Sequence, residues 1–377
     1  MAKLFDHVGI SYPFTKAKKP APKLEKEWLD ALEHPLGDEI NELREYEKIR
    51  GTFCKNYIIE KNVAGKLYPQ FHPLKDDANG TKLGRFASSD PNLQNIPARS
   101  KLGKRVRKLF TPDCGHYQWR KHDYSQIHYR ILAHNAVDDG DGSAEALRER
   151  YRNDPDTDYH LDVYMKAAPL LGWSITDQEE IDIKRRPIKN VNFGLLYGQS
   201  EKALAYKAGF SGAQAKDFFR YYHLAAPYVL PTMKAIAREA EQFGYVTTLL
   251  GRRERFKLWE PAFGFGQAPL PYASALEVWG PQIRLAFLYR AVNYKFQGSE
   301  PDLMKKAMRD CDKSGVFDYV GVPRLTCHDE LDWSVKDNSP QTLEAFAFIK
   351  RSMELAIPLR VPVKCDATVG PNWGAAK

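Results

Sequence analysis

The feature that most limits the possible folds is a mainly helical block, residues 140–262, that lies between two blocks of mixed helix and strand. Turn-forming clusters such as "NDPDTD", "GFSG" and "APYVLP" divide this block into separate helices. Before it, residues 105–130 are expected to form a strand, a turn, a second strand and a helix. After it, a long helix around residues 274–294 is expected to precede short strands separated by Gly and Pro. The sequence therefore predicts one mixed subdomain interrupted by a helical one.

The N-terminal segment is expected to be less regular. Residues 1–23 are polar and contain proline, which favours a loop and a crossing strand over a packed helix. Residues 24–57 follow a helical pattern that stops at Pro35 and resumes with Asp38 as a cap. The apolar side of the second helix is then formed by Ile40, Leu43, Tyr46 and Ile49.

The composition favours an anionic partner and a reducing compartment. Lys and Arg number 56 against 48 Asp and Glu, a net charge of +8, which suits nucleic acid first and an acidic membrane surface second. No apolar run approaches the length of a membrane span, so a soluble, intracellular protein is expected. The cysteines are scattered without a C-x-x-C pair, which indicates neither disulfides nor a zinc site; they are Cys54, Cys114, Cys311, Cys327 and Cys365.

A stripe of side chains at four-residue intervals marks the stretch "RRPIKNVNFGLLYG", residues 185–198. Arg185 and Lys189 are followed by Phe193 and Tyr197, and residues four apart are neighbours on a helix. Such a surface suits a ligand with a polyanionic end and a flat end. The alternative is an amphipathic helix whose aromatic rings pack in the core while its cations lie in solvent.

Acidic residues at the ends of two predicted elements suggest a metal site. Asp123 lies where a strand gives way to a helix, and "HDE" at 328–330 lies at the turn of a predicted hairpin. Carboxylate oxygens suit Mg²⁺, and a pair of such ions serves in-line phosphoryl transfer. An acidic turn on its own is usually just solvated. Combined with the stripe, these acids predict a site for a metal-bound triphosphate with a base and a sugar.

These motifs resemble those of a known family. Asp123 in "DYSQI", the stripe at 185–198 and "HDE" resemble motifs A, B and C of family A DNA polymerases, the bacterial DNA polymerase I group. "GRFASSDPNLQNIP" is similar to that family's primer-template segment, "NYKFQG" to a further template contact, and "GPNW" to its C-terminal end. The resemblance runs from about Phe14 to the end, and a phage or a virus is among the expected sources.

The resemblance implies an α+β right-hand fold with an antiparallel-sheet palm, helical fingers and a shortened helical thumb. Only the polymerase module is expected in this chain, without a 3′–5′ exonuclease domain. The implied divisions are 1–62 for the thumb, 63–140 for the first part of the palm with motif A, 141–272 for the fingers with motif B, and 273–377 for the second part of the palm with motif C.

The resemblance also implies roles for individual residues. Two Mg²⁺ ions, with Mn²⁺ as a substitute, would bind Asp123, Asp329 and the Tyr124 backbone, with Glu330 as a supporting acid. Lys189 would also protonate the pyrophosphate leaving group. The implied nucleotide contacts are Arg185, Lys189, Phe193, Tyr197, His160, Gln126 and His128. The implied primer-template contacts are Arg85, Asn95, Arg99, Asn293, Gln297 and His328.

Position 128 departs from the pattern, because it holds His where the family nearly always has Glu. That Glu is the steric gate that excludes a ribonucleotide 2′-hydroxyl and bonds the tyrosine equivalent to Tyr197. His128 is expected to give weaker exclusion, which His128→Glu would sharpen and His128→Ala would relax. The alternative is that His128 points away and a neighbour is the gate.

The function that the resemblance implies is template-directed addition of deoxynucleotides to a primer 3′-end. The expected partners are primed DNA, dNTPs and a separate exonuclease or processivity polypeptide, in the cytoplasm or nucleoid of a bacterial host cell, with no membrane. The alternatives are a single-subunit RNA polymerase and a catalytically inactive protein that only binds primed DNA. Glu330, Phe193 and "DPNLQNIP" favour DNA synthesis over RNA synthesis.

Overall fold

A four-stranded antiparallel sheet joins sequence segments from the two mixed blocks. The computed structural model describes residues 2–15, 19–76, 79–98, 100–207, 210–263 and 267–376. The strand order is β11-β3-β10-β9, with β3 at Gln118–Tyr124, β9 at Leu325–Cys327, β10 at Glu330–Val335 and β11 at Cys365–Gly370. Because β3 pairs with β10 and β11, the helical block is an insertion into the subdomain that this sheet organises. The expected α+β class is confirmed.

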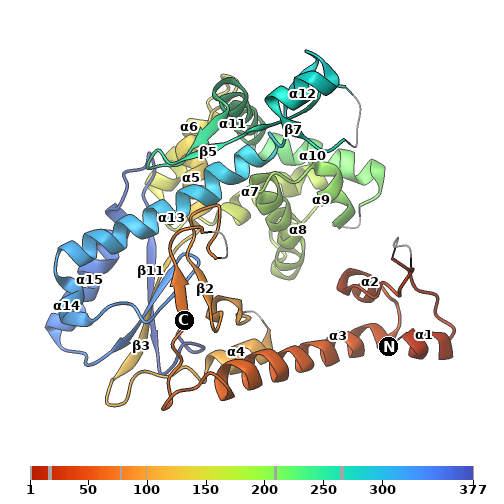
Figure 1. Ribbon diagram of the computed structural model, residues 1–377. Helices are drawn as coiled ribbons and strands as arrows, with labels where there is room; N and C mark the ends of the chain where they lie inside the picture. Colours follow the sequence, from red (N-terminus) through yellow and green to blue (C-terminus); the bar gives the residue numbers. More distant parts are fainter. Residues whose placement is uncertain are drawn as a thin grey trace.

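Helices cover the apolar face of the sheet (Figure 1). They are α5 (Ile127–Asn135), α13 (Arg290–Lys313), α14 (Val316–Val320) and α15 (Pro340–Leu355). Alternate residues of a strand point to one face, and Trp333 of β10 packs against Phe346 of α15 with ring centroids 5.6 Å apart. The opposite face carries Asp123, Lys121 and Glu330. The acids that were expected to form a metal site therefore lie on the side of the sheet away from this core.

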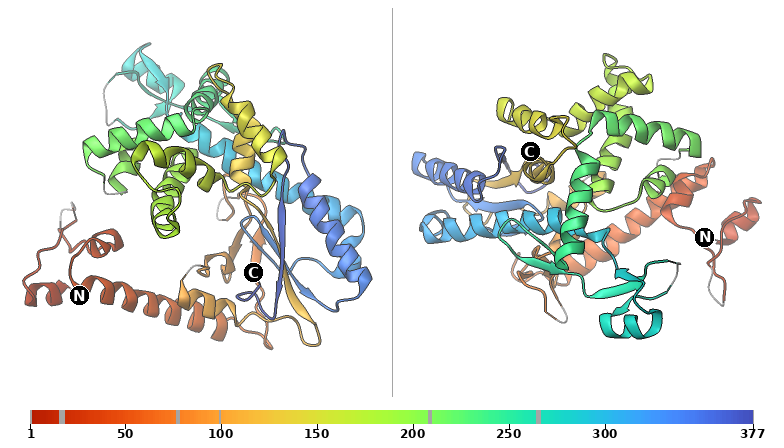
Figure 2. Two further views of the ribbon diagram at one scale, coloured as in Figure 1. Left: turned by 180° about the vertical axis from the view of Figure 1, so that it is seen from behind. Right: turned by 90° about the horizontal axis from the view of Figure 1, so that it is seen from above.

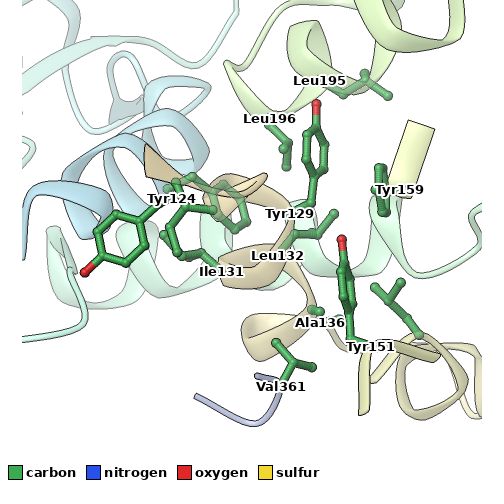
Figure 3. Close-up of a cluster of buried hydrophobic side chains, with 14 of the residues drawn as sticks. Tyr124, Tyr129, Ile131, Leu132, Ala136, Tyr151, Tyr159, Leu195, Leu196 and Val361 are labelled. Atoms are coloured by element: carbon green, nitrogen blue, oxygen red, sulfur yellow. The ribbon is translucent and has the colours of Figure 1, made fainter. Parts of the chain in front are cut away.

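The inserted block is helical from residue 143 to residue 243, as expected, and then forms strands. Its helices are α6 (Ser143–Asn153), α7 (Tyr159–Leu171), α8 (Gln178–Leu196), α9 (Glu201–Lys207), α10 (Gly212–Ala225) and α11 (Val229–Phe243). They share one core with α5, in which the rings of Tyr129 and Tyr159 stack 4.4 Å apart (Figure 3). None of the helices in the described part of the chain is long and apolar enough to cross a membrane.

The long helix expected around 274–294 is wrong. The chain forms two small sheets and a short helix there: β4 (Tyr245–Thr247) with β5 (Arg253–Arg255), then β6 (Leu258–Pro261), β7 (Leu270–Pro271), α12 (Tyr272–Trp279) and β8 (Ile283–Leu285). Gly280, at a φ of 70°, ends α12, and Pro281 follows it. Glycine adopts this left-handed conformation easily and proline cannot continue a helix, so the apolar pattern is divided between two helices.

The N-terminal helices extend away from the sheet (Figures 1 and 2). They are α1 (Ala2–His7), α2 (Lys26–Asp30), α3 (Pro35–Lys48) and the π-helix η1 (Ile49–Ile59). The loop expected for residues 1–23 is wrong at α1, because Phe5 is buried against Trp28 with ring centroids 5.2 Å apart.

Two details of α3 also differ from expectation. His34 is the cap in place of Asp38, since its Nδ1 accepts a hydrogen bond from the Leu36 amide at 3.2 Å. Leu43 and Tyr46 are each 50% exposed, although they were expected to be on the buried side. The reason is that α3 joins two separate cores, one at its start and one beyond its end, and its middle packs on neither.

The segment before β3 carries a pair of short strands and two short helices. They are β1 (Gln70–His72) paired with β2 (Ala87–Ser89), the 3-10 helix η2 (Leu93–Asn95) and α4 (Lys101–Arg107). The first strand expected within 105–130 is therefore wrong, because Ser100 caps α4 by accepting a hydrogen bond from the Gly103 amide at 3.1 Å. The five cysteines are free thiols, as expected.

Candidate active site

Two carboxylates meet where β3 and the β9–β10 hairpin end. Asp123 is the last residue but one of β3, and Asp329 lies in the turn before β10. The Tyr124 amide donates a hydrogen bond to the Asp329 carbonyl at 3.1 Å, which joins the two strand ends directly. The sequence therefore located both acids correctly, at the ends of neighbouring strands.

The electrostatics of this pair favour a bound cation. Burial raises the pKa of Asp123, and the negative charges of Asp329 and Glu330 raise it further. Burial also raises the pKa of Asp329, followed by the charge of Glu300. The described residues contain no group of three or more His, Cys, Asp or Glu side chains arranged for a metal. Two repelling carboxylates beside the Tyr124 backbone are nevertheless an oxygen donor set that fits a hard divalent ion.

Glu330 is held by side chains that the sequence interpretation missed. It is buried directly opposite Asp123, with Oε2 3.3 Å from Lys121 Nζ and Oε1 3.9 Å from Arg107 Nη1. The Trp373 indole also donates a hydrogen bond to Oε1 at 3.0 Å. The two-residue strand period could have located Lys121, because it places Lys121 on the same face as Asp123. The Arg107 and Trp373 contacts depend on the tertiary fold.

The four-residue stripe lies along α8 as predicted. Arg185 forms an ion pair with Asp158, Lys189 Nζ lies 6.0 Å from the Phe193 ring centroid, and the Phe193 and Tyr197 rings are 5.7 Å apart. Both rings are only partly buried and pack on the edge of the core. The sequence offered a ligand-binding surface or an amphipathic helix with buried rings. The structure combines the two, because the Phe193 and Tyr197 rings contribute to the core and still present an accessible side.

His160 and Gln126 both contact protein groups around the start of α7. His160 is 3% exposed, and its Nδ1 accepts a hydrogen bond from the side-chain amide of Asn192 at 3.0 Å. Burial lowers the pKa of His160 to about 3. The ring is therefore neutral and packs 5.3 Å from Phe193. Gln126 adopts a φ of 50°, and its Oε1 accepts a hydrogen bond from the Tyr159 amide at 3.1 Å.

The residues expected to contact primer and template are spread over three elements. Asn95 is exposed at the end of η2, and His328 is exposed at the hairpin turn with a φ of 60°. Asn293 and Gln297 lie one turn apart on α13 and are partly buried. The Tyr197 side chain hydrogen-bonds Gln297, which brings the end of α8 to α13. Arg99 lies outside the described residues.

Arg85 and His128 meet at a buried carboxylate, Glu300 of α13. Arg85 Nε donates a hydrogen bond to Glu300 Oε2 at 2.9 Å, and His128 Nε2 lies 3.0 Å from the same oxygen. The His128 ring also packs edge-to-face on Tyr197, with centroids 6.0 Å apart. Glu300 was not identified from the sequence. The only available signal was that two acids, Glu300 and Asp302, occur in the stretch "GSEPDLM", which otherwise reads as the buried part of a helix.

Comparisons with known proteins identify the family of this chain. A sequence model described as DNA polymerase family A matches residues 1–375. The chain belongs to DNA polymerase family A. DNA polymerase I of Geobacillus stearothermophilus is 31% identical over 379 residues, which are 99% of this chain and 39% of that protein. A DNA-directed DNA polymerase of Pseudomonas phage M6 is 27% identical over 422 residues, covering 99% of this chain and 56% of that one.

The fold is also that of a family A polymerase domain. The solved POL domain of Pol1 from M. smegmatis, in complex with DNA primer-template and dNTP, matches all of this chain with a TM-score of 0.77 and 27% identity. The match covers 60% of that structure's chain. The right-hand fold expected from the family A resemblance is thereby confirmed. The chain spans about two-fifths of the bacterial relative's length.

Proposed function

We propose that this family A chain is a template-directed DNA polymerase that adds deoxynucleotides to a primer 3′-end. The observation that carries the proposal is that one acid of the carboxylate pair and the aromatic end of the α8 stripe lie near the same guanidinium. Arg85 interacts electrostatically with both Tyr197, at the aromatic end of the stripe, and Asp329. A metal-binding pair and a cationic-aromatic helix around one point suit a nucleoside triphosphate and a primer end.

In the proposed site, Asp123, Asp329 and the Tyr124 carbonyl would hold two Mg²⁺ ions, or Mn²⁺ in their place. When bound, such ions activate the primer hydroxyl and neutralise charge on the pyrophosphate. The protein groups bind and orient the reactants around them. Glu330, held by Lys121 and Trp373, keeps the end of β10 in position opposite Asp123.

Each residue of the α8 stripe would contact a different part of the nucleotide. Arg185 and Lys189 would bind the triphosphate, and Lys189 would give a proton to the leaving pyrophosphate. Phe193 would lie against the sugar and Tyr197 beside the templating base. Arg85, Asn95, Arg99, Asn293, Gln297 and His328 would contact primer or template, and Gln126, His128 and His160 would complete the nucleotide site.

Primer extension with Mg²⁺, run with deoxynucleotides and ribonucleotides in parallel, tests this function. Asp123→Ala and Asp329→Ala should each abolish nucleotide addition, whereas primer-template affinity should change little because cationic contacts to phosphate dominate binding. Glu330→Ala should cost less activity than either. The matched control is Asp366→Ala, since Asp366 lies opposite Asp123 on the other neighbouring strand and pairs with Lys364.

The outcomes separate the alternatives. A DNA polymerase is supported if the unchanged chain and Asp366→Ala extend the primer with deoxynucleotides and both Asp123→Ala and Asp329→Ala do not. Preferential extension with ribonucleotides would indicate an RNA polymerase instead. Tight binding of primed DNA without extension by either nucleotide would indicate an inactive binding protein.

A further inference from the structure

Glu300 is a deeply buried acid beside the site and has no role in the assignments above. It is 1% exposed, in the middle of α13, and the chain packs it between two side chains from elsewhere. Its Oε2 accepts from Arg85 Nε at 2.9 Å and from Arg85 Nη2, and it lies 3.0 Å from His128 Nε2. Its Oε1 has no hydrogen-bond partner among the described residues. A carboxylate this deep is tolerated only because these partners offset its loss of hydration.

The charge state of Glu300 agrees with that arrangement. Burial alone would raise its pKa, but hydrogen bonding and the charges of His128 and Arg85 outweigh burial and hold the pKa below its ordinary value. Glu300 is therefore a carboxylate at neutral pH, and it acts only as an acceptor. Both groups that face Oε2 must then present an N–H to it.

This requirement fixes the imidazole of His128. Its Nε2 lies 3.0 Å from Glu300 Oε2 and 3.1 Å from Arg85 Nη2, which itself donates to the same oxygen. Because a carboxylate only accepts, Nε2 pairs with Oε2 by directing its proton at Glu300, and in that state it does not accept a hydrogen bond from another group. The ring plane is held at the same time between Glu300 and the edge-to-face contact with Tyr197. A histidine freed from Glu300 could rotate and offer Nε2 to a ribonucleotide 2′-hydroxyl.

We propose that Glu300 is a positioning residue for nucleotide sugar selection: it holds His128 in one orientation, with the Nε2–H directed at the carboxylate, so that the ring excludes a 2′-hydroxyl and does not bind it. The same oxygen connects this gate to Arg85, the proposed primer contact. The inference rests on the proposed polymerase function and deepens it by adding a residue from α13 that determines selectivity.

A consequence of the pair is that position 128 cannot be changed independently of position 300. His128→Glu in the unchanged background would place a second carboxylate against Glu300 at the same buried point. Two carboxylates about 3 Å apart cannot both be ionised, so the site would take up a proton or rearrange. The sharper selectivity expected for His128→Glu should therefore appear only when Glu300 is also neutralised.

The first test measures kcat/KM for deoxy- against ribonucleotide incorporation in primer extension. Glu300→Ala should relax the ratio by roughly tenfold, the effect of losing one charge-assisted hydrogen bond, and Glu300→Gln should relax it less because its amide oxygen can still accept. A ratio within one enzyme is insensitive to partial loss of folded protein. The matched control is Glu239→Gln, because Glu239 of α11 forms another partly buried ion pair with α13, to Lys295 at 2.7 Å. This variant should leave the ratio unchanged.

The second test is a reciprocal exchange. His128→Glu alone should lower deoxynucleotide kcat/KM by roughly tenfold or more, and adding Glu300→Gln should restore it together with exclusion of ribonucleotides. The inference is overturned if both Glu300 variants keep the ratio of the unchanged chain. It is also overturned if His128→Glu alone is as active and as selective as the double variant. Either result leaves the polymerase proposal intact. No extension by the unchanged chain with either nucleotide would overturn the polymerase proposal, and this inference with it.

Discussion

At the scale of single residues, burial decides the charge of the histidines around the site. His122 and His160 both lie in the core, and burial lowers the pKa of each to about 3, with positive neighbours contributing further. A neutral ring suits His160, because its Nδ1 accepts a hydrogen bond from Asn192, whose own oxygen accepts from Tyr222 at 2.7 Å. Protonation of Nδ1 would remove that acceptor.

This burial predicts a specific loss of stability in acid. The pKa of His160 is about 3 when folded against 6.5 when unfolded, so the unfolded chain takes up a proton that the folded chain does not. The stabilising contribution is complete above pH 6.5 and is lost as the pH falls toward 3. Between pH 7 and pH 5 the unchanged chain should lose about 2 kcal/mol more unfolding free energy than His160→Gln, measured by urea denaturation.

Glutamine is chosen because its amide oxygen can still accept the hydrogen bond from Asn192. His7→Gln is the control: His7 is exposed in α1, and its replacement should leave the pH dependence of the unchanged chain intact. Equal pH dependence in the unchanged chain and His160→Gln would show that the His160 ring is not held neutral.

Single residues also show what sequence reasoning could reach. Asp123 and Asp329 were predictable because an acid at a strand end projects from a local element, whatever the rest of the fold. Glu300 was not, because its partners Arg85 and His128 are separated from it by 215 and 172 positions along the chain (300 − 85 and 300 − 128). His160 resembles a phosphate contact in sequence, and only packing shows that its ring is enclosed.

At the scale of elements, α8 carries its ligand groups on one side by periodicity alone. Arg185, Lys189, Phe193 and Tyr197 share that side because helical neighbours are four residues apart, and Asp177 caps the helix. Tertiary structure adds the ion pair from Arg185 to Asp158, the capping residue of α7. Arg185 is therefore already oriented in the free protein by a neighbouring helix.

The stripe predicts graded effects on nucleotide use. Arg185→Ala should raise the nucleotide KM by about tenfold through the loss of a charge-assisted contact. Lys189→Ala should lower kcat by on the order of a hundredfold if it protonates the leaving group. Phe193→Tyr should increase dideoxynucleotide acceptance, because the added hydroxyl can replace the missing 3′-hydroxyl contact. Single-turnover incorporation at varied nucleotide concentration measures all three.

Arg186→Ala provides the control for α8, since Arg186 adjoins Arg185 but is exposed and lies off the stripe. Unaltered nucleotide kinetics in both Arg185→Ala and Lys189→Ala would make α8 a purely structural helix.

Helices and strands were predicted correctly where all the apolar residues of one periodic pattern pack on the same core. The β9–β10 hairpin and α8 are examples. Prediction failed where packing changes along a pattern: the apolar run around 274–294 is interrupted at Gly280, which ends α12, and it continues through β8 into α13. Leu43 and Tyr46 continue the pattern of α3 across a stretch that contacts neither adjoining core. No local rule gives the position of the next core.

At the scale of the whole molecule, a cluster of exposed cations lies on one short helix beside the sheet. The chain carries a net charge of +8. Lys101, Lys104, Arg105 and Lys108 are all exposed on and just after α4. This short helix directly follows residues 84–97, the segment that resembles the primer-template segment of family A. The exposed cations of α4 are therefore well placed to contact DNA phosphates.

The expected result is a steep salt dependence of DNA binding to which α4 contributes. Each phosphate contact releases about one counterion, so the logarithm of primer-template affinity should fall linearly with the logarithm of salt concentration. Lys104→Ala and Arg105→Ala should each weaken binding and reduce the slope by about 1, whatever the DNA sequence. Lys313→Ala, which removes an exposed cation at the far end of α13, should leave the slope unchanged. Fluorescence anisotropy of a labelled primer-template at several salt concentrations measures the slopes, and equal slopes for the α4 variants and the unchanged chain would place the DNA backbone away from α4.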